Sequence, residues 1–161
     1  MRVRDATEAD KPALVALQLA SWRDAYRGVL PDAYLDGSLA ADLRDRWAAR
    51  DLGQTVTLIA GEADGFVCCL LDRTPPYVDN LHAHPARRGA GTGGALMAAL
   101  FMRLRDMGHE AVALTVLEGN AGARRFYARL GGTEGATRPT ELMGHPVREV
   151  PVTFRLDRPG G

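Results

Sequence analysis

A glycine-rich turn in the middle of the chain is the strongest candidate for a ligand site. Residues 84–97 hold two arginines and then four glycines that lead into a helical pattern: Gly89, Gly91, Gly93 and Gly94. Glycines let the backbone fold back and aim several N–H groups at one point. The start of a helix adds unpaired N–H donors and the positive end of the helix dipole. The turn therefore predicts a site for a phosphorylated ligand.

Two other interpretations of this turn stay open. The spacing Gly89-x-Gly91-x-x-Gly94 formally matches the dinucleotide fingerprint, and Glu118 ends the next predicted strand, where a ribose-binding acid would stand. Two features argue against a nicotinamide cofactor. In the dinucleotide-binding fold the glycines follow their strand almost directly and open the fold, whereas here residues 84–88 intervene and a helix pair and a hairpin precede the turn. The second alternative is an ordinary tight turn, although four glycines cost chain entropy that a purely structural loop does not need.

The composition narrows the classes of function. The chain has 161 residues, which predicts a single domain over 1–161. Lys and Arg number 20 and Asp and Glu number 20, so we expect no broad electrostatic attraction to nucleic acid or to a membrane surface. The longest apolar runs, 66–71 and 111–117, are too short to span a bilayer. The N-terminus lacks a signal-peptide core, so we expect a cytoplasmic protein.

Lysine and cysteine usage exclude further chemistries. Lys11 is the only lysine, which rules out a phosphate loop of the Gly-Lys-Ser/Thr kind and leaves no central lysine for a Schiff base. Cys68 and Cys69 are neighbours in an apolar run, which predicts a buried, reduced pair.

The elements that would position the turn follow from hydrophobic periodicity. Helical spacing is predicted over four ranges: 7–26, 32–50, 96–107 and 120–130. Strands are predicted over seven: 1–4, 55–60, 66–71, 77–83, 112–117, 133–138 and 147–156. The order β-αα-βββ-α-β-α-ββ predicts an α/β fold of the mixed α+β kind, with a central sheet of six to seven strands flanked by about four helices.

A second segment favours one interpretation of the glycine turn. Residues 114–131 form a predicted strand, then Asn120, then a helix with a Phe-Tyr pair and a closing Leu-Gly. Together with the pattern Arg88-x-x-Gly91-x-Gly93, this segment resembles the GNAT superfamily of N-acetyltransferases. The predicted order of elements resembles that superfamily as well. The resemblance implies a GNAT-like fold and the transfer of an acetyl group from acetyl-CoA to a primary amine.

The resemblance also implies which residues bind acetyl-CoA. The pantetheine arm would pair with the strand backbone at Leu81, His82 and Ala83. Asn120 would hydrogen-bond this arm, cap the following helix, or do both. Arg124 and Arg125 are candidates to reach the ribose 3′-phosphate. The pyrophosphate would be held by Arg88 and the backbone of the turn: Gly89, Ala90, Gly91, Thr92, Gly93 and Gly94.

Catalysis needs an acid, an oxyanion donor and a neutral amine. Tyr127 matches the superfamily's general acid, because a phenol stays protonated at neutral pH and can donate to a thiolate. A backbone N–H near Leu81 is the candidate oxyanion donor. Thr115 stands where some members carry a glutamate base, so Asp79 is the preferred base here, His82 the second, and a base-free site the third. Asp79 and His82 face opposite sides of a regular strand unless a bulge intervenes.

The acceptor side is less defined. Trp22, Tyr26 and Tyr77 are candidates either for an acceptor pocket or for the core. His82 and His84 lack a third ligand at suitable spacing, so we expect no metal. The partner would be a small-molecule or peptide amine, and because dimers are common in the superfamily, a homodimer is an open alternative. A non-catalytic module that binds acyl-CoA, a nicotinamide-dependent oxidoreductase and a donor with another acyl chain remain alternative functions.

Overall fold

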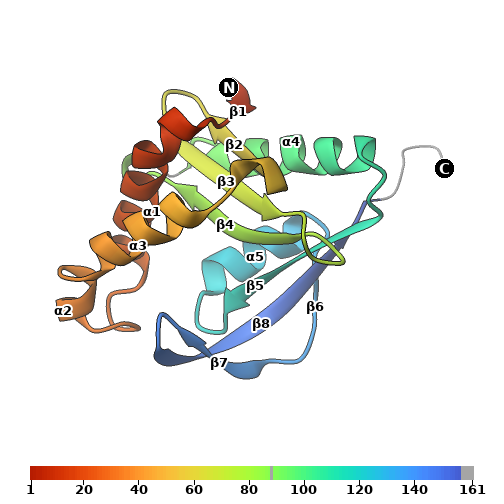
Figure 1. Ribbon diagram of the computed structural model, residues 1–161. Helices are drawn as coiled ribbons and strands as arrows, with labels where there is room; N and C mark the ends of the chain where they lie inside the picture. Colours follow the sequence, from red (N-terminus) through yellow and green to blue (C-terminus); the bar gives the residue numbers. More distant parts are fainter. Residues whose placement is uncertain (88, 157–161) are drawn as a thin grey trace.

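The computed structural model describes residues 1–87 and 89–156 (Figure 1). Its strands are β1 (Val3–Asp5), β2 (Thr55–Ala60), β3 (Gly65–Leu70), β4 (Tyr77–Ala83), β5 (Ala111–Leu117), β6 (Thr133–Glu134), β7 (Arg138–Leu142) and β8 (His145–Arg155). Its α-helices are α1 (Lys11–Ala25), α2 (Asp32–Leu35), α3 (Leu39–Ala49), α4 (Thr92–Asp106) and α5 (Ala121–Arg129). Short 3₁₀ helices are η1 (Glu8–Asp10), η2 (Leu52–Gln54) and η3 (Pro85–Arg87).

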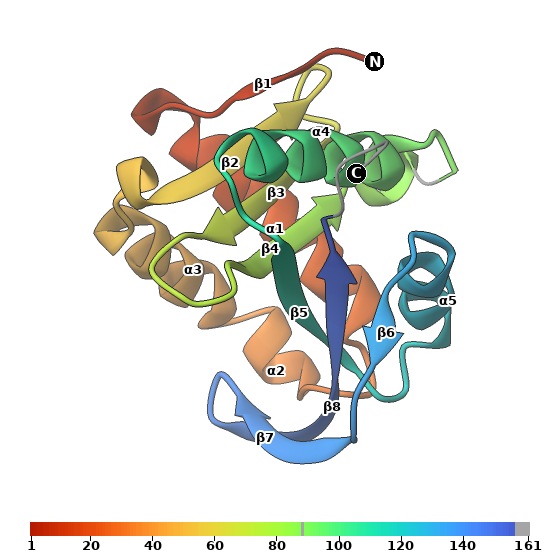
Figure 2. The same cartoon turned by 90° about the vertical axis from the view of Figure 1, so that its right-hand side faces the viewer.

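One mixed sheet of eight strands organises these elements. The strand order is β1-β2-β3-β4-β5-β8-β6, and β7 pairs with β8. Among the strand pairs of the described residues, β4–β5 is parallel and the others are antiparallel. Helices α1 and α3 cover one face and α4 covers the other (Figures 1 and 2). Leu14, Trp47 and Phe66 lie in the core under α1 and α3, whereas Leu100 and Phe154 lie in the core under α4. The predicted fold class is confirmed, with one more strand and one more helix than expected.

The sheet divides between β4 and β5. β4 pairs with β3 along its whole length, but it pairs with β5 at a single position, Tyr77 opposite Ala113. Figure 2 shows the two strands running apart beyond this point. The divergence leaves the β5-facing edge of β4 open over its C-terminal half, which is where a ligand with an extended amide chain can add to a sheet.

A β-bulge in β4 decides which side chains face the same way. Two consecutive residues of β3 pair with Val78 and Asn80, so Asp79 is left over as the extra residue. Val78 packs into the α4-side core, whereas Asp79 and Asn80 both accept hydrogen bonds from Arg50 at the end of α3. His82 contacts α1 on that same side. The bulge thus brings Asp79 and His82 together, although a regular strand would separate them.

The helix predicted over 32–50 is wrong in one respect, because it is two helices. α2 ends at Leu35, a turn follows over 36–38, and α3 begins at Leu39. Asp, Gly and Ser are weak helix formers, so the turn forms where three of them are consecutive. The predicted apolar row nevertheless holds, since all four of its members are buried: Leu35, Leu39, Leu43 and Trp47.

The C-terminal strands also differ from the prediction. The sequence predicts strands at 133–138 and 147–156, but a long hairpin of β7 and β8 occupies 138–155. Its two-residue turn places Met143 and Gly144 at φ of 50° and 82°, with Leu142 opposite His145. Such turns favour Asn-Gly or Asp-Gly, because both residues need positive φ. A methionine there hides the hairpin from sequence inspection.

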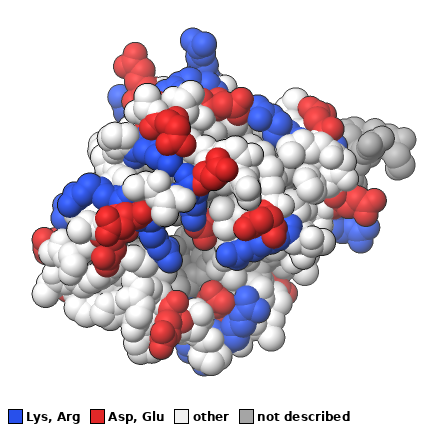
Figure 3. All heavy atoms as spheres, in the orientation of Figure 1, with Lys and Arg blue, Asp and Glu red and all other residues white. Residues whose placement is uncertain are grey.

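Three further features concern the surface charge, the length of the helices and the two cysteines. Acidic and basic side chains are interspersed around a hollow on the face that Figure 3 shows. None of the described helices is long and apolar enough to cross a membrane. Cys68 and Cys69 are free and buried in β3, which confirms the predicted reduced pair.

Candidate active site

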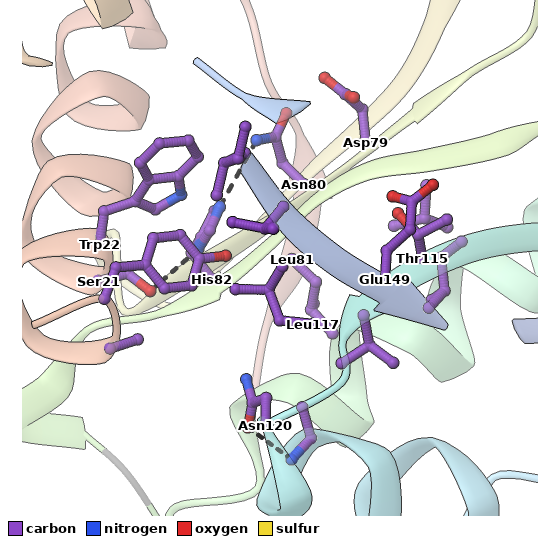
Figure 4. Close-up of a pocket in the computed structure, with 18 of the residues that line it drawn as sticks. Ser21, Trp22, Asp79, Asn80, Leu81, His82, Thr115, Leu117, Asn120 and Glu149 are labelled. Carbon is purple, nitrogen blue, oxygen red and sulfur yellow. Dashed lines mark hydrogen bonds between the residues drawn. The ribbon is translucent and has the colours of Figure 1, made fainter. Parts of the chain in front are cut away.

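Two cavities open where β4 and β5 separate. The polar cavity, of about 350 Å³, lies between α1, β4, β5 and the β7–β8 hairpin, and its lining includes Ser21, Trp22, Tyr77, Asp79, Asn80, His82, Thr115 and Glu149 (Figure 4). The glycine cavity, of about 1190 Å³, lies between the end of α1, β4 and the N-terminal ends of α4 and α5. Both cavities are lined by Tyr26, Leu81, Leu117, Asn120 and Tyr127. The two cavities therefore meet at the division of the sheet.

The glycine turn presents backbone donors to the glycine cavity. Gly89 and Gly91 both have a φ of 80°. A residue with a Cβ atom adopts this backbone conformation only at a cost in free energy. Gly91 precedes α4, and the first backward hydrogen bond of the helix runs from Ala95 N to Gly91 O at 3.0 Å. The N–H groups of Thr92, Gly93 and Gly94 lie before the first bonded N–H of the helix and therefore have no acceptor within it. These predicted residues thus lie together and are suited to an anion.

Thr92 adds a polar group that has no partner within the fold. Its residue is 2% exposed, and its Oγ1 is buried without a hydrogen-bond partner among the described residues. Its methyl group packs closely against Gly65 of β3. A Cβ atom at Gly65 would lie only 2.7 Å from Thr92 Cγ2. A buried hydroxyl without a partner is costly unless a ligand or water satisfies it. The Thr92 hydroxyl therefore needs a bonding partner that reaches it inside the fold at this helix start.

The arginines around the glycine cavity differ from those predicted. Arg124 donates to both oxygens of Glu134 at 2.9 Å and to the Glu118 carbonyl at 2.9 Å, so its guanidinium is already engaged. Arg125 does not line the cavity. Arg88 lies outside the described residues. The basic residues that do line the cavity are Arg87, Arg129 and Arg148.

Asn120 lies at the meeting point and caps α5. Its Oδ1 accepts from Ala123 N at 3.1 Å, as the sequence predicts for a cap (Figure 4). The cap uses only the oxygen, so the Nδ2 group has no protein partner among the described residues. Asn120 can therefore cap its helix and still donate a hydrogen bond to a ligand.

Tyr127 borders both cavities. Its ring packs 5.3 Å from Phe126 and 6.1 Å from Phe154, between ring centroids. Burial, and then the neighbouring Tyr26 and Tyr77, raise the pKa of the Tyr127 phenol well above its usual value. The phenol is therefore protonated throughout the physiological range and can act only as a proton donor there.

His82 is held inside the polar cavity by both ring nitrogens. Nδ1 lies 3.0 Å from Ser21 Oγ, and Nε2 lies 3.5 Å from Asn80 Nδ2 (Figure 4). The ring also lies 5.5 Å from Phe66, between centroids. Burial lowers the pKa of His82 to about 4, although the nearby Asp79 acts in the opposite direction. The imidazole is therefore neutral near pH 7 and has a free lone pair on one ring nitrogen, although the burial that lowers its pKa also makes it a weaker base.

Asp79 is paired with a residue that sequence inspection did not single out. Arg50 Nη2 lies 2.7 Å from Asp79 Oδ2, and Arg50 Nη1 donates to Asn80 Oδ1 at 3.0 Å. Arg50 directly follows α3, and its contact with Asp79 depends on the bulge that turns Asp79 toward this side of the sheet. No local pattern in the sequence indicates that residues 50 and 79 meet.

Glu149 is a second carboxylate that the sequence did not point to. It lies opposite Leu117 in the β5–β8 pair, and Arg138 Nε binds its Oε1 at 2.8 Å. Beside it, Tyr77 Oη and Thr115 Oγ1 are 2.7 Å apart, and burial raises the pKa of Tyr77. The pairing register of β8 places Glu149 at the cavity, and that register is not readable from spacing alone.

The two remaining predictions concern aromatics and metals. Trp22, Tyr26 and Tyr77 all line the polar cavity, and Trp22 is also part of the core at 5% exposure. His84 Nδ1 accepts from Ala86 N at 3.1 Å, which shapes the corner before the glycine turn. Over residues 1–87 and 89–156, no group of three or more His, Cys, Asp or Glu side chains is arranged to hold a metal ion.

Two cavities that meet where the sheet divides provide room for two molecules side by side, with an anion site in one of them. The chain matches the profile of the acetyltransferase (GNAT) family over residues 18–132 and belongs to this family. The predicted family and the predicted class, an N-acetyltransferase enzyme, are thereby confirmed. No protein among the curated sequences gives a significant match to the chain.

Solved structures share the fold at low sequence identity. YncA, a putative acetyltransferase from Salmonella typhimurium solved with acetyl-CoA, has 21% identity and a TM-score of 0.73, covering 100% of this chain and 96% of its own. A GCN5-related N-acetyltransferase from Rhodopseudomonas palustris has 22% identity and a TM-score of 0.78, covering 96% and 94%. The ribosomal-protein-S18-alanine N-acetyltransferase of Escherichia coli has 18% identity and a TM-score of 0.72, covering 99% and 96%.

Proposed function

We propose that the chain transfers an acetyl group from acetyl-CoA to a primary amine by direct transfer in a ternary complex. The observation that carries this proposal is the meeting of the two cavities at Leu81, Asn120 and Tyr127. A carrier in the glycine cavity and an amine in the polar cavity would have their reactive ends adjacent. Such positioning supplies much of the rate of a two-substrate reaction.

The residues around the glycine cavity fit acetyl-CoA. The N–H groups at the start of α4 would hold the pyrophosphate. The open edge of β4 at Leu81, His82 and Ala83 would pair with the amide-rich arm. Asn120 Nδ2 would donate to the same arm. Among the basic residues that line this cavity, we assign Arg129 to the remaining phosphate.

Tyr127 would serve as the general acid. Acetyl-CoA supplies an acetyl group activated as a thioester, and its leaving sulfur needs a proton. A thiol titrates near ~8.5 and a phenol near ~10, and burial widens that gap by raising the pKa of Tyr127. The Tyr127 phenol thus holds its proton until a thiolate develops beside it.

His82 would serve as the general base for the amine. The neutral imidazole offers a lone pair inside the polar cavity, and its pKa of about 4 keeps it unprotonated in neutral solution. Asp79 is the alternative base, but its Oδ2 already binds the Arg50 guanidinium. A proton on that oxygen would have to displace the ion pair. The contacts therefore favour His82 over Asp79.

Direct transfer is favoured because neither cysteine suits a covalent route. Cys68 and Cys69 are both 0% exposed in β3, and neither lines the two cavities. Burial raises the pKa of Cys69 to about 12 and also raises that of Cys68. A thiol that stays protonated is a poor nucleophile.

The proposal is tested by supplying acetyl-CoA with a panel of amines and measuring released CoA thiol and acetylated product. The panel would contain polyamines, amino acids, aminoglycosides and peptides with a free N-terminus. We expect turnover with at least one amine, and a large loss of turnover in Tyr127→Phe. Saturable binding of acetyl-CoA without turnover on any amine would instead favour a non-catalytic acyl-CoA-binding module.

A further inference from the structure

Four side chains from three separate elements form one hydrogen-bonded chain beside the polar cavity. It runs from Arg50, after α3, to Asn80 and His82 on β4 and ends at Ser21 on α1. Figure 4 shows the part from Asn80 through His82 to Ser21 lying along the cavity wall. The direction of each bond in this chain follows from which atoms can donate.

The direction is set at the arginine. A guanidinium can only donate, so the Asn80 atom at 3.0 Å from Arg50 Nη1 must be the amide oxygen. The Asn80 Nδ2 group then faces His82 Nε2, and an amide nitrogen can only donate. Nε2 must therefore carry the lone pair, and the proton of the neutral ring must lie on Nδ1. That proton is donated to Ser21 Oγ at 3.0 Å.

We propose that Arg50 and Asn80 are positioning residues that fix His82 as its Nδ1–H tautomer, so that the Nε2 lone pair accepts the proton of the acceptor amine. The inference rests on the proposed function for the role of Nε2, but the tautomer itself does not depend on it. The contact from Asn80 Nδ2 to Nε2 is long, at 3.5 Å, so an amine N–H can replace it.

Arg50 is suited to this task because it is held on several sides. Its guanidinium binds Asp79 at 2.7 Å as well as Asn80, and it lies 4.8 Å from the centre of the Trp47 ring. Its Nη1 also lies 3.6 Å from Cys68 Sγ. The bulge at Asp79 allows the two neighbouring residues of β4 to meet the two nitrogens of one fork. Lysine, as a single point of charge, cannot reproduce that fork.

The proton transfer leaves the Arg50–Asn80 and His82–Ser21 hydrogen bonds in place and breaks only the long contact from Asn80 Nδ2, because Nε2 becomes a donor itself. The amine nitrogen gives up one proton as its new bond to the acetyl carbon forms, and Nε2 takes that proton. The resulting imidazolium still donates from Nδ1 to Ser21, and it later releases the extra proton to water. The charged side chains nearest the network are Asp79 on β4 and Arg50 after α3. Other charged and titratable residues that line the same cavity are Tyr26, Arg46, Tyr77, Tyr127, Glu141 and Glu149.

The test reads the tautomer directly, by long-range ¹⁵N–¹H correlation spectra of the imidazole rings. The chain has four histidines, and the loss of one signal set in His82→Gln assigns His82. We expect the wild-type protein to show Nδ1 protonated and Nε2 unprotonated at pH 7. An Nε2–H ring in the wild-type protein would overturn the proposal whatever the enzyme does.

Two variants test the cause of the tautomer. Asn80→Asp places an acceptor against Nε2 while Arg50 can still hold it, so we expect the ring to change to Nε2–H. Arg50→Lys should give mixed tautomers, because the Asn80 amide is then free to rotate. The control is Arg4→Lys on β1, because Arg4 likewise uses two guanidinium nitrogens, in its case for the two carboxylate oxygens of Asp10 at 2.9 Å each. An unchanged His82 spectrum in both Asn80→Asp and Arg50→Lys would contradict the proposal.

Activity gives a separate reading. With an amine that the enzyme accepts, we expect Asn80→Asp and Arg50→Lys to lower kcat about 10–100-fold, with little change in KM for acetyl-CoA. This is less than the ~10²–10⁴-fold effect of general acid–base catalysis, because His82 itself is still present. Arg4→Lys should keep the wild-type kcat. A changed tautomer with unchanged kcat would remove Nε2 from the mechanism while leaving acetyl transfer intact. A wild-type protein without turnover on any amine would instead count against the proposed function, and the spectra would still decide the tautomer.

Discussion

The glycine cavity and the polar cavity meet at the same residues but are built in different ways. The anion site of the glycine cavity consists mainly of backbone N–H groups from one continuous segment at the start of α4. The polar cavity is made by side chains from α1, the end of α3, β4 and β8, which come together through a bulge and a strand register. A backbone site can be recognised from local sequence, whereas a side-chain site of this kind depends on long-range pairing.

The two cavities also place different demands on the fold. In the glycine cavity a phosphate site needs positive φ angles, which Gly89 and Gly91 supply, and free N–H groups, which the first residues of α4 supply. In the polar cavity each functional group depends on another: His82 on Asn80, and Asn80 on Arg50. We therefore expect substitutions at the first to weaken carrier binding, and substitutions at the second to change rate and pH dependence.

The largest expected effect lies at the boundary of the cavities. Tyr127→Phe removes only the phenol oxygen, so we expect kcat to fall by about 10²–10⁴-fold because the acid is lost, whereas the Kd for acetyl-CoA should change little. Steady-state kinetics and titration calorimetry measure the two quantities. A kcat within twofold of wild type would remove Tyr127 from the chemistry and leave it as a packing residue.

A smaller effect should appear in the pH dependence of the free energy of unfolding, because His82 in the polar cavity is buried as a neutral ring. The pKa of His82 is about 4 in the folded state and about 6.5 in the unfolded state. Burying the neutral imidazole therefore costs no stability above pH 6.5, but the free energy of unfolding decreases as the pH falls toward 4, because the unfolded state binds the proton more tightly. Between pH 7 and 4.5 this histidine should cost the folded state about 2 kcal/mol. Urea unfolding of wild type and His82→Gln over that range measures the difference. Parallel pH curves for the two proteins would show that His82 titrates normally.

A matched pair of glycines tests the backbone character of the glycine cavity. Gly91 and Gly108 both have positive φ, at 80° and 91°, and a Cβ at either would meet nothing within 4 Å. Gly91→Ala and Gly108→Ala should therefore lose similar stability, about 1 kcal/mol each. Only Gly91→Ala should weaken acetyl-CoA binding, by about 10-fold, or 1.4 kcal/mol. Equal acetyl-CoA affinity in the two variants would mean that the turn is structural only.

The smallest expected effect distinguishes two arginines of α5. Arg129 lines the glycine cavity, whereas Arg124 is held by Glu134 and the Glu118 carbonyl. We expect Arg129→Gln to weaken acetyl-CoA binding several-fold and more strongly at low salt, as screened charge contacts do. Arg124→Gln should leave the Kd nearly unchanged. If Arg124→Gln has the larger effect, its side chain must leave Glu134 when the ligand binds.

How far the sequence predicts this protein depends on the range of the interactions. The strand, glycine-turn and helix patterns predict the fold class, and the Asn120 cap follows from one local pattern. The β7–β8 hairpin escapes prediction because Met143 is an unusual residue at positive φ. Arg50 escapes because it is 29 residues from Asp79 along the chain and meets it only through the bulge. Local signals thus predict the carrier side and leave the acceptor side to the structure.

The central claim is that the glycine cavity receives CoA, and thermal unfolding with acetyl-CoA, free CoA and NADH in parallel tests it most directly. A ligand at 100 times its Kd adds about 2.7 kcal/mol to stability, which raises Tm by roughly 5–10 °C at this size. We predict such a shift with acetyl-CoA and with CoA, and none with NADH. A shift with NADH alone would contradict the assignment of the glycine turn and of every site residue that depends on it.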